Sequence, residues 1–264
     1  KGGDREKQWP KIRRLLLSDD PEALDFVKDE LHSGGGGGPG GGGGKGGGGG
    51  GGGRDGGSEK HKRLLHMIGV QSPSAYWKLC IDAIDDHEVD LRTEAIVALE
   101  QIAAPEALKD LTAALQDEKD PRVQKELLRA IGACGAADAR SRAMLTKKAK
   151  SEKNELLKLN AIVALGALDP DPAVKDELRF ALAEGTDKER VAAACAIALS
   201  RDETWLEEIN ALLPDAKDAE LTKALTATRG VLKGGKLRLV ADHVQQVAED
   251  KVERDRLFGP RKNN

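Results

Sequence analysis

Aromatic residues are scarce in this chain, whose 264 residues include three Trp, one Tyr and three Phe. Such a small number does not fill the interior of a typical β-sandwich or β-barrel. Alanine and leucine must fill the core instead, which suits closely packed helices. Long apolar runs are also missing, because no stretch approaches the roughly 20 residues that a membrane span needs. The sequence therefore predicts a helical protein with no membrane partner.

Cysteine occurs only at Cys80, Cys134 and Cys195, and the sequence has no C-x-x-C motif. An odd number at wide spacings argues against a disulfide framework and against a zinc site, so buried free thiols are the ordinary interpretation. Free thiols favour a reducing compartment such as the cytoplasm. The chain starts at Lys1 without a methionine, which leaves an upstream export signal or domain open.

Neither sign of charge dominates, since the formal net charge is only -3 although 33% of the residues are charged. A mixed, mildly acidic chain has no overall attraction to nucleic acid or to an anionic membrane. Lysines cluster at Lys147, Lys148, Lys150 and Lys153. A lysine cluster in a turn is usually solvated surface, so nucleic acid is not favoured as a partner. A protein partner of unknown identity is favoured instead.

Catalytic and metal-binding patterns are absent from the sequence. No H-E-x-x-H occurs, and His61 and His66 are five residues apart, which turns them away from each other on a helix. The acidic turn around His87 lacks the spacing of a calcium loop, and acids at a helix start ordinarily act as caps. We therefore predict no catalytic residue, no cofactor and no metal site.

Glycine is concentrated in one tract between His32 and Ser58. Glycine has the largest backbone entropy to lose and no side chain to bury, so the tract is predicted to be a disordered insertion within a helix pair. The predicted organisation comprises a leading helix and the first helix of repeat 1 (1–33), the insertion (34–57), a repeat array (58–233), and a C-terminal capping helix with its tail (234–264).

The remaining sequence repeats a helical pattern. Dipeptides such as Ile131-Gly132 and Leu165-Gly166 recur at intervals of 30 to 34 residues, together with counterparts that begin at Ile68, Leu99, Leu199 and Arg229. Asp-Pro pairs such as Asp120-Pro121 mark helix starts. A fixed period of this length indicates a solenoid of helical hairpins. The predicted pairs are 21–32 with 58–69, 74–85 with 90–103, 105–116 with 121–133, 137–150 with 154–167, 172–183 with 187–200, and 203–212 with 217–232.

The residues Leu91-Arg92-(x)2-Ala95-(x)2-Ala98-Leu99 resemble HEAT repeats, specifically the short HEAT-like kind named after the phycobilisome lyases. The resemblance covers nearly the whole chain apart from the glycine tract and the tail. It implies an all-α, right-handed α-solenoid of about six HEAT-like hairpins with a C-terminal capping helix. Only Arg92 matches the family arginine. Lys158 is a cognate, whereas Gln124, Ala192 and Thr222 depart from the pattern, so polar ladders between repeats are expected to be incomplete. Arg229 at the leucine position predicts an irregular last pair.

In such solenoids the second helices line the concave face, and two of them are apolar on every side. The ordinary explanation is burial between neighbouring repeats; the sharper hypothesis is a partly apolar groove over the fourth and fifth repeats that binds a helix or an extended peptide. The candidate partner-binding residues are Val97, Lys125, Arg129, Leu159, Val163 and Ile197. We predict a non-catalytic scaffold. A lyase-type enzyme or accessory subunit that acts on a chromophore or a partner protein is the alternative that the resemblance implies, and nucleic-acid binding is a weaker one.

The segment after Lys236 carries Leu237, Val240, Val244 and Val247 at helical spacing, with charges on its other face. A solenoid needs a terminal element with a polar exterior, so a capping helix over 236–256 is predicted. An interaction or dimerisation helix is the alternative.

Overall fold

The computed structural model describes residues 25, 27–29, 55–71 and 74–248, and among these residues every regular element is a helix. The predicted leading helix, most of the glycine tract and the tail beyond residue 248 lie outside this part. The chain divides into two compact units, Lys1–Ala114 and Leu115–Asn264, and each is described by itself. The all-α class predicted from composition and periodicity is confirmed.

The first unit is built from short helical hairpins whose second helix is the long one. Helix α6 packs against both α4 and α5. Helix α4 begins at Asp55, three residues before the predicted start. The elements are α4 (Asp55–Gln71), a 3-10 turn (Ser74–Tyr76), α5 (Trp77–Ile81), α6 (Val89–Ile102), a second 3-10 turn (Pro105–Ala107) and α7 (Leu108–Asp117), which continues past the division.

The prediction of one helix over 74–85 was wrong in its second half. Helix α5 ends at Ile81, and the chain continues in tight turns in which Ala83 N donates to Cys80 O at 3.1 Å. Three acids follow at Asp82, Asp85 and Asp86. Negative charge is unfavourable at a helix C-terminus, where the backbone dipole already presents carbonyl oxygens, so these residues oppose extension of the helix.

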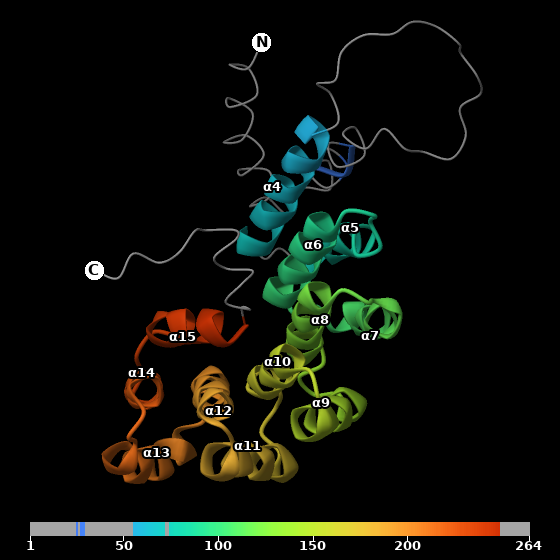
Figure 1. The fold of residues 1–264 in the computed structure, drawn as a ribbon. Coiled ribbons are helices and arrows are strands. Elements are labelled where there is room, and N and C mark those ends of the chain that lie inside the picture. The colour runs from blue at the N-terminus through green and yellow to red at the C-terminus, as the bar shows by residue number, and fades with distance from the viewer. Residues whose placement is uncertain (1–24, 26, 30–54, 72–73, 249–264) are drawn as a thin grey trace, which may run out of the picture. The chain divides into compact units, whose positions relative to one another are not determined.

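The second unit is a regular array of two layers. Figure 1 shows the second helices α8, α10, α12 and α14 in one layer and the first helices α9, α11 and α13 in the other. Among the first helices, α13 is short, because 3-10 turns flank it on both sides. The elements are α8 (Pro121–Cys134), α9 (Ala139–Ser151), α10 (Glu155–Leu165), α11 (Pro172–Glu184), α12 (Asp187–Ser200), α13 (Leu206–Leu212), α14 (Ala219–Leu232) and α15 (Arg238–Ala248).

Side-chain caps fix most of these helix starts. Asp171 accepts a hydrogen bond from Ala173 N at 2.9 Å, and Asp218 accepts one from Leu221 N at 2.7 Å. At α12, Thr186 and Glu189 form a reciprocal capping box. Each cap satisfies amide groups that have no partner inside the helix. Helices α11 and α12 therefore begin at the predicted residues.

The repeated hydrophobic position forms the core of both units. Ile68, Leu99, Ile131 and Leu165 are at most 1% exposed, whereas Leu199 is half-buried. The glycine that follows three of these residues (Ile68, Ile131 and Leu165) allows close helix contact. A Cβ atom at Gly132 would lie 2.7 Å from the carbonyl oxygen of Ala164, so α8 and α10 approach more closely than any larger residue would permit.

Candidate partner-binding surface

The layer of second helices in the second unit has a face that is turned away from the first helices, and helix α15 lies on it. We call the sides of α8, α10, α12 and α14 on this face the inner face. Helix α15 packs against α10, α12 and α14, and Figure 1 shows it on the opposite side of this layer from α11 and α13. The C-terminal helix therefore covers three repeats rather than the last pair alone.

Helix α12 is buried on every side between Val191 and Ala198. All eight residues from Val191 to Ala198 are at most 6% exposed, and five of them are alanine. The helix packs against its hairpin partner α11, against the neighbouring second helices α10 and α14, and against α15. A second helix in an open solenoid has only three such neighbours, so α15 supplies the fourth.

The predicted partner-binding residues divide into two groups. Leu159, Val163 and Ile197 are at most 3% exposed, as the ordinary explanation of apolar second helices predicts. On α6 and α8 the residues are partly polar and less uniformly covered: Val97 and Arg129 are half-buried, and Lys125 is 7% exposed. Binding of a partner by these six residues stays a prediction.

The cations on α8 interact with a buried acid. Lys125 Nζ lies 3.6 Å from Glu126 Oε1, and Arg129 NH1 lies 3.9 Å from Glu126 Oε2. Glu126 is 8% exposed. Because its charge is removed from water, it needs these neighbouring cations. In the first unit, the Glu94 carboxylate contacts His66 Nδ1 at 2.9 Å.

Lys158 and Arg92, the two residues at the family arginine position that carry a positive charge, make different contacts. Lys158, the cognate of the family arginine, forms an ion pair with Glu189 of the following repeat. Arg92 instead donates to the carbonyl oxygens of Asp86 at 2.8 Å and His87 at 3.3 Å in its own turn. Arg92 thus contributes to holding this turn, and Lys158 joins two repeats.

Charged pairs also join successive first helices. Lys175 Nζ lies 2.6 Å from the Asp202 carboxylate, and Arg179 contacts Glu208 at 2.9 Å. The hydrogen bond from Lys175 holds the pKa of Asp202 below its ordinary value. Arg179 also lies over the ring of Trp205, 5.1 Å from its centroid. The outer layer is therefore held by polar contacts around one buried aromatic side chain.

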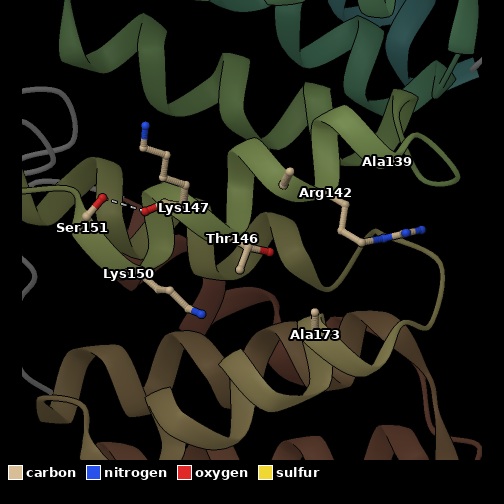
Figure 2. Close-up of a pocket in the computed structure, with 8 residues that line it drawn as sticks. Ala139, Arg142, Thr146, Lys147, Lys150, Ser151 and Ala173 are labelled. Atoms are coloured by element: carbon tan, nitrogen blue, oxygen red, sulfur yellow. Dashed lines mark hydrogen bonds between the residues drawn. The ribbon is translucent and has the colours of Figure 1, made fainter.

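A shallow trough lies between α9 and α11 (Figure 2). Small side chains such as Ala139, Ala143 and Ala173 leave the space, and the lysine cluster identified in the sequence lies at one end. Its cations are not arranged as one basic surface. Lys150 is directed towards α11, where its Nζ lies 3.3 Å from Glu177 Oε2, and Lys147 is directed away from α11.

Two further sequence features have structural explanations in the described part of the chain. In the acidic turn, Asp86 Oδ1 accepts a hydrogen bond from Glu88 N at 2.8 Å, an ordinary turn contact. No group of three His, Cys, Asp or Glu residues is placed to hold a metal ion there. All three cysteines are free and buried, and burial raises the pKa of Cys80 and of Cys195 to about 12.

Sequence reasoning missed the position of α15. Val240 and Val244 were assigned to the apolar stripe of a terminal cap, and the structure buries both, at 1% and 9% exposed. It also places their helix on α10 and α12 as well as on α14. The available signal was α12 itself, because a second helix without a polar face needs a cover on its fourth side.

The match to a family model agrees with this architecture. The family model of HEAT repeats matches residues 60–132 and 109–200, which together span more than half of the chain. No curated protein matches the sequence. Among solved structures, a designed armadillo repeat protein shares 19% identity over 84% of this chain and 99% of its own length, with a TM-score of 0.35. None of the described helices is long and apolar enough to cross a membrane.

Proposed function

The chain belongs to the HEAT repeat proteins, and from this premise we propose that it is a non-catalytic scaffold that binds a protein partner. The partner contributes a helix, and this helix docks on the face that the second helices form, the concave face of a solenoid. The phycobilisome-lyase subtype stays a prediction from sequence, and no described residue favours lyase chemistry over binding.

One observation carries this proposal: the inner face already holds a helix. Helix α15 packs on α10, α12 and α14, and its residues Val240 and Val244 are buried. A surface of small and branched apolar side chains that accepts one amphipathic helix has the shape and chemistry to accept another. By contrast, the outer layer presents isolated apolar residues such as Phe180, which is 59% exposed, among charged ones.

Position-specific crosslinking tests which face the partner uses. A photoreactive amino acid replaces Arg129, half-buried on second helix α8, in one variant and exposed Phe180 on first helix α11 in a second. Both full-length proteins are irradiated in extract of the native cell, and the attached protein is identified by mass spectrometry. We expect a specific adduct at position 129 and none at position 180. The reverse result would place the partner on the outer layer and refute the proposal.

A further inference from the structure

The burial of the inner face changes along the array in a way that repeat stacking alone does not explain. In the second unit, the position two residues before the repeated core residue is occupied by Arg129, Val163 and Ile197. Arg129 is half-buried, whereas Val163 and Ile197 are at most 1% exposed. On α14 the equivalent Ala227 is half-buried again. Full burial occurs on α10 and α12, two of the three helices that α15 packs against.

The connection between α14 and α15 allows α15 to dissociate from the inner face. Helix α15 follows Gly234 and Gly235, and Gly234 has a φ of 88°, a left-handed conformation that favours glycine. Most helical stability in globular proteins comes from packing of an apolar face, so the helical state of α15 depends on docking. A helix on a glycine joint is therefore well suited to exchange.

Within the described residues, the docked face of α15 contains an unsatisfied polar atom. Val240 and Val244, one helical turn apart, are buried, whereas the neighbouring Ala241 is exposed. His243 is half-buried, and its Nδ1 atom is buried without a hydrogen-bond partner among the described residues. A buried polar atom that makes no hydrogen bond weakens the interaction. A helix with an apolar residue at that position would fit the same surface better.

From these observations we infer that α15 is an intramolecular ligand of the inner face and occupies the place of the partner's helix. This inference rests on the proposed function. The partner is a protein with an amphipathic helix that carries branched apolar residues one turn apart and an apolar residue where α15 has His243. The surface holds one helix at a time, so partner binding requires release of α15.

A labelled peptide with the sequence of residues 236–248 provides a direct probe. Two full-length variants form a matched pair: Val240→Asp places a charge on the buried side of α15, and Ala241→Asp places the same charge on its exposed side. In the wild type and in Ala241→Asp, the tethered helix competes with the peptide at an effective concentration in the millimolar range. We expect Val240→Asp to bind the peptide about tenfold more tightly than either. Equal affinities in a folded Val240→Asp protein would overturn the inference.

A thiol placed in α15 keeps the test decisive if the aspartate variant does not fold. Val240→Cys is a small change that retains an apolar side chain, and Ala241→Cys is its exposed control. The native cysteines are buried, and mass spectrometry separates their signal from that of the new thiol. Excess peptide should accelerate alkylation of the Val240→Cys thiol severalfold and leave the rapid reaction of the control unchanged. An unchanged rate at position 240 would show that the peptide does not displace α15.

The crosslinking assay then separates this inference from the proposed function. If the partner attaches at position 129 and Val240→Asp increases its capture, both stand. If the partner attaches there and Val240→Asp leaves capture unchanged, the proposed function stands and the role of α15 is refuted. If light scattering shows a wild-type dimer that Val240→Asp dissociates, a second copy exchanges α15, and a separate partner helix is refuted.

Discussion

Substitution by alanine is expected to have opposite effects on stability at Gly132 and at Gly230. Each follows the repeated core position, and each lies two residues before the end of its helix, α8 or α14. A Cβ atom at position 132 would lie 2.7 Å from Ala164 O and 3.1 Å from Ala164 Cβ, both parts of a packed neighbouring helix. At position 230 it would meet Leu239 Cδ1 at 3.1 Å and no other described atom of a neighbouring element within 4 Å.

The magnitude follows from two opposing effects. Alanine is favoured over glycine within a helix by about 0.8–1.0 kcal/mol. Crowding a packed interface costs about 1–3 kcal/mol, and a backbone carbonyl cannot move aside as the end of a leucine can. We therefore expect Gly132→Ala to lower the free energy of unfolding by about 1 kcal/mol and Gly230→Ala to raise it by up to about 1 kcal/mol. The difference corresponds to roughly 4–8 °C in melting temperature for a chain of this size.

Urea denaturation followed by far-ultraviolet circular dichroism measures this difference. The midpoints of the two variants and the wild type are compared, and equal slopes show that the change in midpoint reports stability. A Gly132→Ala protein as stable as Gly230→Ala would refute the close helix contact that the repeated glycine is taken to permit.

Three further experiments test the packing and the charges of the second unit. Asn160→Leu removes a fully buried amide whose Oδ1 has no hydrogen-bond partner among the described residues; urea titration should show a gain of about 1 kcal/mol, and a loss would indicate that this oxygen is satisfied. Lys150→Met leaves the buried carboxylate of Glu177 without the ammonium group 3.3 Å away; it should cost about 1–3 kcal/mol, most of which the added change Glu177→Met restores in a double-mutant cycle. Asp202 has a lowered pKa because Lys175 donates a hydrogen bond to it, so its stabilising contribution is present above the unfolded-state pKa of about 3.9 and is lost as the pH falls through the folded value. The melting temperatures of the wild type and Asp202→Asn should differ near neutral pH and converge in strong acid, and a constant difference would contradict the assignment.

The sequence predicts most helix positions because the signals that set them are local. Asp171 and Pro172 lie next to each other in the sequence, and the cap and first turn that they form depend on no distant residue. Where the prediction was wrong, at 74–85, the overlooked signal was also local: the acids at Asp82, Asp85 and Asp86 oppose continuation of α5. Local physical chemistry therefore accounts for both the successes and the error.

The candidate surface is harder to predict because its cover comes from a distant segment. Spacing alone identifies Val163 and Ile197 as members of one row on the second helices. It does not distinguish an open groove from a covered one, because both need apolar residues at these positions. The distinction depends on where α15 docks, and the amphipathic pattern of α15 is equally compatible with a cap on α14 alone.

The composition of α12 suggests a general criterion for this distinction. An open solenoid exposes one side of each second helix, so at least a few polar residues are expected there, as at Arg129 on α8. Between Val191 and Ala198, α12 has no charged side chain and no side chain larger than isoleucine. Small residues let a fourth helix approach closely, and the lack of charge removes the cost of burying that side. A second helix rich in alanine on all sides therefore indicates a covered inner face, and in this chain the cover is a segment that begins only a few residues after the last repeat.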